Sequence, residues 1–248
     1  MSAGPHRLSK SKIAAFEHCP RRLWLQVHRR DEARFDADTL ARFRFGHHVG
    51  AEAAFLVPDG IMVDVAPDDM ATALARTAEL LRAGPARPIF EATFQHQGVL
   101  CRVDILEPFA RGWRAIEVKA STRVKAYELA DLATQVWVMR GTGLHVRQAV
   151  IRHLAPPFSW ARPDIAAVRF VDADVTQPLE RYLSTRGAVA HQARRTVEGA
   201  EVQRATGPHC ERPFTCEFRQ YCSRVEATPL LAWKSEEASA PERSSQTS

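Results

Sequence analysis

Two segments near the middle of the chain have the composition of β-strands. Residues 99–106 and 113–118 are rich in β-branched and apolar side chains, and residues 107–112 between them contain the Pro and Gly of a turn. This pattern predicts a hairpin. An apolar segment at residues 88–94, followed by turn residues 95–98, precedes it, so we expect a meander of three antiparallel strands.

Helical periodicity, capping residues and prolines predict helices on both sides of this meander. They are expected at residues 9–17, 20–30, 37–56, 67–81, 126–140 and 177–198, and further strands at 61–65, 145–153 and 167–171. Together these elements indicate an α/β protein with a single domain over residues 1–222. Residues 223–248 are too polar and too poor in aromatic residues to pack, so we expect a disordered tail.

Composition narrows the class of partner. The chain has 248 residues, 45% hydrophobic content and a net charge of +5, with a pI of about 9.2. A modest positive excess favours a polyanion such as nucleic acid. No apolar run is long enough for a signal peptide or a membrane span, so we expect a soluble, cytoplasmic protein.

Three residues in the predicted hairpin suit phosphodiester chemistry. Glu117 and Lys119 are two apart on a strand and therefore share a face, and Asp104 lies on the partner strand. If Asp104 faces the same side, two carboxylates and an ammonium group converge. Carboxylate oxygens bind Mg²⁺ or Mn²⁺, which can activate water, and the lysine can hold that water or the developing negative charge. A solvated ion-pair face is the alternative.

Other polar residues are candidates for the same site. His48 and Glu52 are four apart on the predicted helix 37–56, share a face, and are candidates for a first metal ligand. Gln135, on helix 126–140, would reach the edge of the site if that helix packs beside strand 113–118. Glu91 points either into the site or into water. Each of these residues has a plain surface position as its alternative.

Four of the five cysteines form a second set. Cys210, Cys216 and Cys222 follow one another with five residues between each pair, in a segment rich in prolines and aromatics, and Cys19 near the other end is the natural fourth ligand. Zinc accepts four thiolates but usually uses paired C-x-x-C knuckles, which this chain lacks. An iron-sulfur cluster tolerates one distant ligand, so we favour it. Cys101 is expected in the core.

Several segments in order carry a resemblance to a known family. These are the N-terminal CPRRLWL, the CRVD strand ending at Asp104, the IEVK strand ending at Lys119, the STRVKAYELADLATQ helix, and the C-terminal GPHC with its two further cysteines. From Ser9 to Cys222 the chain resembles the PD-(D/E)XK nuclease superfamily. It is most similar to the RecB-like branch with an iron-sulfur cluster, which includes CRISPR-associated Cas-type exonucleases and AddB-type nuclease subunits.

The resemblance implies a restriction-endonuclease-like core and a set of roles. Asp104, Glu117 and the Val118 carbonyl would bind Mg²⁺ or Mn²⁺, Lys119 would be the catalytic lysine, and Gln135 the helix glutamine of a later motif. Cys19, Cys210, Cys216 and Cys222 would bind a 4Fe-4S cluster that staples the chain ends. The likeliest substrate by resemblance is single-stranded DNA, cut at its ends.

The chain departs from the family pattern at three places. Gly50 stands where the family usually has a metal-binding histidine, so His48 or Glu52 would have to substitute, and Met139 stands where a tyrosine is frequent. The last cysteines are also spaced more widely than the tight pair of the CRISPR enzymes.

Two rival readings follow from these features. The first is a nucleic-acid-binding iron-sulfur protein whose nuclease site has decayed, for which Gly50 is the best argument. The second is a zinc-stapled scaffold. Four arginines are candidate phosphate contacts or a surface charge run: Arg21, Arg22, Arg29 and Arg30. DNA against RNA as substrate, and a helicase or CRISPR-system partner, stay open.

Overall fold

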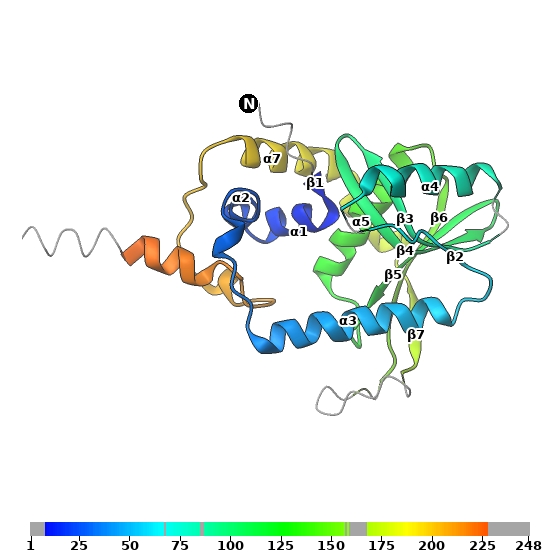
Figure 1. Ribbon diagram of the computed structural model, residues 1–248, viewed down its shortest axis with the longest axis horizontal. Coiled ribbons are helices and arrows are strands. Elements are labelled where there is room, and N and C mark those ends of the chain that lie inside the picture. The colour runs from blue at the N-terminus through cyan, green and yellow to red at the C-terminus, as the bar shows by residue number, and fades with distance from the viewer. Residues whose placement is uncertain (1–7, 67, 85–86, 157, 159–167, 228–248) are drawn as a thin grey trace, which may run out of the picture.

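A computed structural model describes residues 8–66, 68–84, 87–156, 158 and 168–227 of the chain. These residues form a mixed α/β fold in which one central sheet is flanked by helices (Figure 1). This confirms the fold class that the sequence predicts. No helix in the described part of the chain is long and apolar enough to cross a membrane.

The central sheet has seven strands and mixes parallel with antiparallel pairs. Its order is β2-β3-β4-β5-β6-β7, with β1 paired to β4. The predicted meander is confirmed as β3-β4-β5, which is antiparallel throughout, whereas β5 and β6 run parallel. The strands are β1 (Leu8–Ser9), β2 (Ile61–Met62), β3 (Ile89–His96), β4 (Val99–Phe109), β5 (Gly112–Lys119), β6 (Val146–Leu154) and β7 (Phe170–Asp174).

The hairpin between β4 and β5 has a tighter turn than the six residues expected. The pairing continues to Phe109 with Gly112, so only two residues, Ala110 and Arg111, are left for the turn. Both have left-handed φ angles, 45° and 57°, as a two-residue hairpin turn of the right twist requires.

Strands β3 and β4 share a kink at one residue pair. In β3, Ile89 and Ala92 both reach the main core although they are three apart, while Phe90 packs in a separate cluster on the other side of the sheet. The residue inside this break is Glu91, whose φ of 58° lies in the left-handed region. Its register position in β3 is opposite Asp104 in β4, between the flanking pairs Phe90 with Ile105 and Ala92 with Val103. The kink therefore sets Glu91 and Asp104 at neighbouring positions of the two strands.

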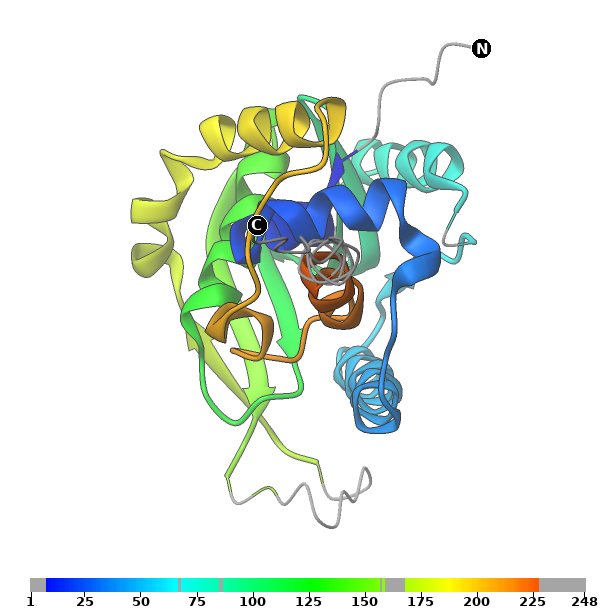
Figure 2. The same ribbon diagram turned by 90° about the vertical axis from the view of Figure 1, so that its left-hand side faces the viewer.

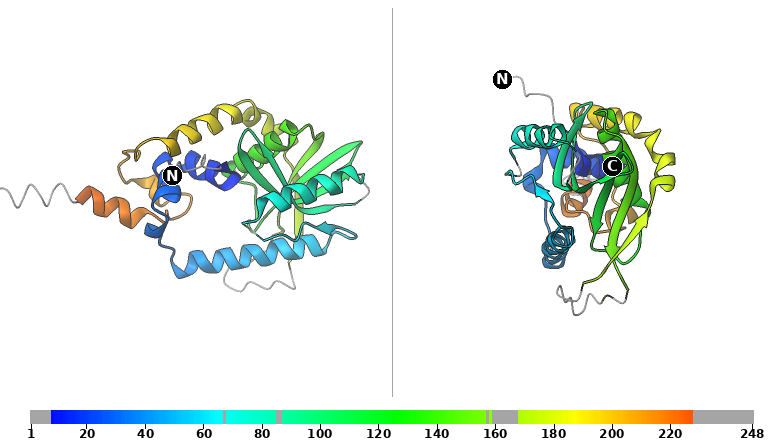
Figure 3. Two further views of the ribbon diagram at one scale, coloured as in Figure 1. Left: turned by 45° about the horizontal axis from the view of Figure 1, so that its top comes forward. Right: turned by 90° about the vertical axis from the view of Figure 1, so that its right-hand side faces the viewer.

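The helices cover both faces of the sheet and extend beyond one end of it (Figure 3). Helix α5 packs its leucines and valines into the main core on one face, and α3 packs Phe45, Val49 and Ala53 on the other. The helices are α1 (Lys10–His18), α2 (Pro20–His28), α3 (Ala37–Phe55), α4 (Met70–Arg82), α5 (Ala126–Gly141), α6 (Thr176–Leu183) and α7 (Arg186–Glu198), with short 3-10 turns η1 (Arg30–Glu32) and η2 (Pro208–Cys210).

Three expected elements differ from those observed. The expected strand 61–65 pairs over two residues only before the chain leaves the sheet toward α4. The expected helix 177–198 is interrupted between α6 and α7, where the Thr185 hydroxyl donates to the Tyr182 carbonyl at 2.7 Å and competes with the helical ladder. The strand expected at 167–171 is shifted to β7, and residue 167 lies outside the described part.

The C-terminal segment, residues 210–227, packs beside α2 near the other end of the chain (Figure 2). Glu217 is buried and accepts from Arg22 Nε at 2.9 Å and from Gln26 Nε2 at 2.8 Å, and Phe218 packs with Leu25. The disorder expected from Ser223 onward is wrong for residues 223–227, because residues 219–227 are helical and Arg224 forms an ion pair with Glu32 at 2.8 Å. Residues 228–248 lie outside the described part.

Candidate active site

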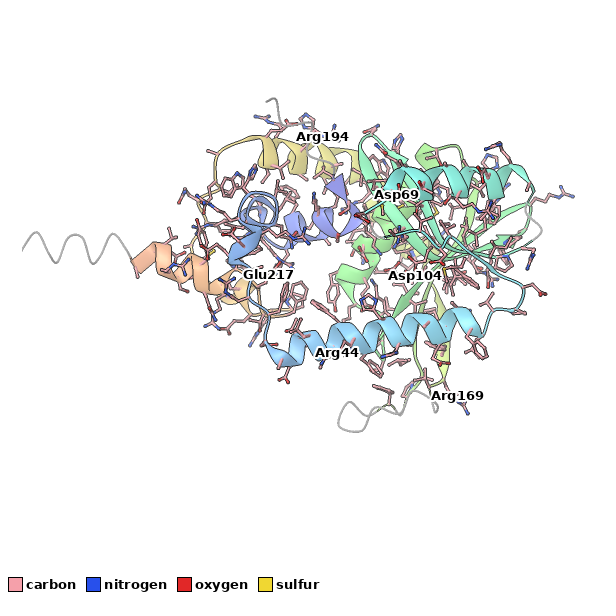
Figure 4. All side chains as sticks on the ribbon, in the orientation of Figure 1. Arg44, Asp69, Asp104, Arg169, Arg194 and Glu217 are labelled. Atoms are coloured by element: carbon pink, nitrogen blue, oxygen red, sulfur yellow. The ribbon has the colours of Figure 1, made fainter. Side chains whose placement is uncertain are left out.

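The candidate site lies where β4 and β5 separate. Their pairing ends at Ile105 and Ile116, and in place of the next ladder bond the Val118 amide donates to Asp104 Oδ2 at 2.7 Å. Strand β1 fills the gap beside β4. We call this gap between β4 and β5 the fork. It holds polar groups that two continuously hydrogen-bonded strands would exclude. In Figure 4, Asp104 lies within the sheet, on the side of α3.

Glu117 is at the centre of the fork and is 2% exposed. Its Oε1 accepts from Lys119 Nζ at 2.6 Å and from Lys10 Nζ at 2.8 Å. Its Oε2 accepts from Gln135 Nε2 in a very short hydrogen bond. Three donors fix the orientation of this carboxylate, which agrees with the placement expected for Gln135 beside strand β5.

Asp131 of α5 closes the charge cluster. Its Oδ2 lies 2.9 Å from Lys119 Nζ and 3.5 Å from Lys10 Nζ. Both ammonium groups are therefore shared between Glu117 and Asp131. Helical spacing presents Asp131 and Gln135 on one face of α5, toward the sheet.

Lys10 is a site residue that the sequence did not reveal. It is the first residue of α1, directly after β1, and sits 107 positions before Glu117. Ser9 caps α1 by accepting from the Lys12 amide, which fixes where Lys10 leaves the sheet. No local motif marks such a residue, because only the pairing of β1 with β4 brings it to the fork.

Burial and charge shift the pKa values of these groups strongly. Burial, reinforced by the charge of Glu117, raises the pKa of Asp104 from 3.8 to about 7. Burial alone would also raise the pKa of Glu117, but Lys10 and Lys119 outweigh it and lower that pKa well below its usual range. For Lys10, burial is outweighed by Asp131 and Glu117, which raise its pKa. Near neutral pH the Asp104 carboxyl group is therefore close to its own pKa and can exchange a proton.

A cleft of about 560 Å³ opens onto the fork from the side of α3. The sheet contributes Asp104, Glu117 and Lys119 to its lining. Glu91 also lines the cleft, and burial raises the pKa of this carboxyl group. Of the two positions left open for Glu91, the cleft is the one observed. Its Oε2 lies 3.8 Å from Arg102 Nε.

Helix α3 forms the opposite wall of the cleft. This wall includes His47 and Gly50, whereas His48 and Glu52 are not among the lining residues. A Cβ atom built on Gly46 or Gly50 would meet nothing within 4 Å, so the glycines leave open space rather than a tight contact. The expectation of His48 or Glu52 as a further ligand therefore does not match the cleft lining, in which the candidates are His47, next to His48 in the chain, and Glu91, which the sequence analysis had left open.

The donor set suits a hard cation with water among its ligands. In the described part of the chain, no three His, Cys, Asp or Glu side chains converge closely enough to hold a metal ion by themselves. Magnesium is commonly held by one or two carboxylates with water or substrate completing its shell, and Asp104, Glu117 and the Val118 carbonyl match that pattern. Gln135 Oε1 is buried without a described partner, and a water beside Glu117 would satisfy it.

Four cysteines line one small cavity between α2 and the C-terminal segment. They are Cys19, Cys210, Cys216 and Cys222, and all are buried. Burial raises the pKa of Cys216 and that of Cys222 to about 11, so a metal centre here would have to displace thiol protons. The free volume among them is about 10 Å³, so a cluster would require the walls to move apart. Cys101 is buried in the main core, as expected.

The four arginines of the N-terminal segment divide into two pairs. Arg21 is buried and donates to Glu201 Oε1 at 2.9 Å and to the Arg204 carbonyl at 3.1 Å. Arg22 donates to Glu217. Arg29 and Arg30 are exposed. The first two guanidinium groups are thus engaged within the protein, and the second two remain accessible.

The fold and this site define an α/β protein whose mixed sheet forks around a buried carboxylate–lysine cluster that opens to a cleft. No protein-family model matches the chain, and no curated protein matches its sequence.

Comparison with solved structures finds similar chains at low sequence identity. SSO0001 matches with a TM-score of 0.43 and 13% identity over 90% of this chain and 88% of its own. LHK-Exo in complex with dAMP gives a TM-score of 0.39 and 14% identity, over 77% and 90% of the two chains. The alkaline exonuclease LHK-Exo from Laribacter hongkongensis gives 0.33 and 13%, with the same coverage. At these scores the likeness carries no conclusion about activity.

Proposed function

We propose that this chain is a metal-dependent deoxyribonuclease of the PD-(D/E)XK type, in its RecB-like branch, that hydrolyses phosphodiester bonds at single-stranded DNA ends. The observation that carries the proposal is the fork, where Asp104 and Glu117 meet beside Lys119 and open to the cleft. Burying these carboxylates together is unfavourable, and a cation-binding role gives a reason for the arrangement.

Each residue has a distinct task in this proposal. Asp104, Glu117 and the Val118 carbonyl would hold Mg²⁺ or Mn²⁺, which when bound polarises a phosphoryl oxygen and lowers the pKa of water. Gln135 and Lys10 keep the Glu117 carboxylate in a single orientation. Lys119 lines the cleft and supplies positive charge where a phosphate would be attacked.

The cysteine cavity supports a second part of the proposal. Cys19, Cys210, Cys216 and Cys222 would bind a 4Fe-4S cluster that joins the two chain ends. The support for it is that these four cysteines line one cavity and that four thiolates are the donor set such a cluster takes, so binding it would require the cysteines to converge further. The cluster would act on stability, because it cross-links segments almost the whole chain apart.

A second function is favoured by one specific observation. Lys10 and Lys119 already compensate the charge of Glu117, so the fork is stable without a divalent ion. The alternative is therefore an inactive DNA-binding protein with the same fold. The DNA-cleavage assay described next distinguishes the two functions.

The decisive experiment incubates anaerobically purified protein with end-labelled single-stranded DNA, duplex DNA and RNA, with Mn²⁺, Mg²⁺ or EDTA. We expect metal-dependent release of nucleotides from single-stranded DNA. Asp104→Asn and Lys119→Ala should abolish cleavage while DNA binding stays within about twofold of the unmodified protein. Lys125→Ala, which removes a half-buried lysine that donates to the Tyr127 hydroxyl, is the matched control and should cleave normally. DNA that is bound but uncut under every metal condition would favour the inactive protein.

Elemental analysis tests the cluster separately. Iron and acid-labile sulfide should be present and zinc absent, and Cys216→Ser should lose the iron. Cys101→Ala, a change at the cysteine in the core, should retain it. Zinc in place of iron would refute the cluster and support a zinc staple.

A further inference from the structure

Helix α3 exposes aromatic side chains where the cleft opens to solvent. Phe43 is 51% exposed and Phe35, just before the helix, is 46% exposed. Their ring centroids lie 5.6 Å apart at an interplanar angle of 69°. In this edge-to-face arrangement each ring restrains the orientation of the other. The N-terminal half of α3, which carries Phe43, extends past the end of the sheet (Figures 1 and 3).

Phe43 belongs to the cleft that contains the carboxylates. The lining runs along α3 from Arg42 and Phe43 to Ala54, about 16 Å by the helical rise, and then reaches Asp104 and Glu117 on the sheet. A ligand held against the ring can therefore continue along the same cleft to the fork. Between Phe43 and Ala54 the α3 lining consists of Gly46 and Gly50, which have no side chain, together with His47 and Ala51.

The charges along this wall complement a nucleic-acid backbone. Among the α3 residues that line the cleft, those with ionisable side chains are Arg42 and His47, and neither is acidic. Arg42 Nη2 donates to Thr39 Oγ1 at 2.8 Å, which restrains an exposed guanidinium on the residue next to Phe43 in the cleft lining. An aromatic face next to a cation suits a base with its phosphate rather than an apolar peptide.

We infer that Phe43, supported by Phe35, is a stacking platform for an unpaired base of the DNA strand whose backbone enters the fork, with Arg42 contacting a phosphate. The inference rests on the proposed function for the identity of the ligand. A base inside a duplex is stacked on both sides and offers no free face, so the platform selects strands that are single-stranded at this point.

The test measures binding without cleavage, in EDTA, with a short single-stranded oligonucleotide carrying 2-aminopurine at successive positions from its end. Stacking on Phe43 should quench one position selectively. Phe43→Ala should remove that quenching and weaken binding about tenfold, the effect of one lost base–aromatic stack. Phe43→Trp should retain both, and Arg42→Ala should reduce the slope of log affinity against log salt by about 1.

Phe55→Ala provides the matched control. Phe55 is 83% exposed on the same helix but does not line the cleft, so its removal should leave affinity and quenching unchanged. An abasic site at the quenched position should weaken binding to the unmodified protein about tenfold and to Phe43→Ala hardly at all.

Two results would overturn the inference. One is unchanged affinity and quenching in Phe43→Ala, with melting temperature confirming a folded protein. The other is a change in oligomeric state on light scattering without any effect on DNA, which would make this face a contact between copies of the chain. If stacking occurs but DNA is never cut, the inference about Phe43 is supported and the nuclease proposal fails. If Phe43→Ala cuts and binds DNA normally, the nuclease proposal is supported and the inference about Phe43 fails.

Discussion

The raised pKa of Asp104 makes a sharp prediction about Asp104→Asn. In the folded, metal-free protein the Asp104 carboxyl group has a pKa of about 7, whereas in the unfolded chain it has the ordinary aspartate value of 3.8. Between these two values the folded state holds a proton that the unfolded state releases, so stability is lost as pH rises from about 4 to about 7. Asparagine has the same shape, accepts the same bond from the Val118 amide, and does not titrate.

The size of the effect follows from the width of that window. Each pH unit within it lowers the free energy of unfolding by about 1.4 kcal/mol, so the ceiling is about 4 kcal/mol for the whole window. Two of these units lie between pH 5 and pH 7, which gives at most about 2.7 kcal/mol between pH 5 and pH 8. Asp104 is partly open to the cleft, and screening by water reduces the expected gain to about 1–2 kcal/mol in favour of the variant at pH 8.

The assay is urea unfolding of both proteins in EDTA at pH 5 and pH 8, followed by the same pair at pH 8 with Mn²⁺. In EDTA, Asp104→Asn should become the more stable protein as pH rises. With Mn²⁺ at about 100 times its dissociation constant, the unmodified protein should gain about 2.7 kcal/mol, and the order should invert. The variant lacks the charged ligand and should gain much less.

Asp172→Asn is the control for a carboxylate-to-amide change on a strand. Asp172 lies on β7, two strands from β5, and accepts from Arg152 Nε at 2.7 Å rather than from a group of the fork. It should show no gain in stability at pH 8. The reasoning is refuted if the difference between Asp104→Asn and the unmodified protein stays the same from pH 5 to pH 8.

Three further predictions concern Lys10, Gly50 and Arg21. Lys10→Met should lower stability in EDTA by about 2 kcal/mol, because Glu117 loses one of its two cations. Mn²⁺ should restore part of the lost stability. Equal losses with and without Mn²⁺ in thermal melts would contradict this prediction. Gly50→Leu should leave stability unchanged or raise it by up to about 1 kcal/mol, because leucine has the higher helix propensity and its Cβ atom would meet nothing within 4 Å. By filling the cleft it should weaken DNA binding, and unchanged affinity by fluorescence anisotropy would show that DNA does not enter there. Arg21→Met should destabilise the protein by about 3 kcal/mol through its buried ion pair with Glu201, with little change in salt-dependent DNA affinity. Arg30→Ala, on the exposed surface, should leave stability unchanged and should change the salt-dependent DNA affinity.

Local sequence pattern determined most of the secondary structure and part of the site. Residues two apart on a strand share a face, and Glu117 and Lys119 indeed meet at 2.6 Å. Helical spacing on α5 likewise placed Gln135 toward the sheet, where it bonds Glu117. These inferences succeeded because strand and helix periods are properties of the backbone and need no knowledge of distant segments.

The tertiary structure alone decided what surrounds these residues. Lys10 reaches Glu117 only because β1 pairs with β4, and the guanidinium group of Arg21 is buried only because the C-terminal segment folds back over α2. The kink at Glu91 and Asp104 depends on two strands breaking their alternation at the same pair. Charge compensation and burial are set by groups far apart in the chain, and no local pattern encodes which of them will meet.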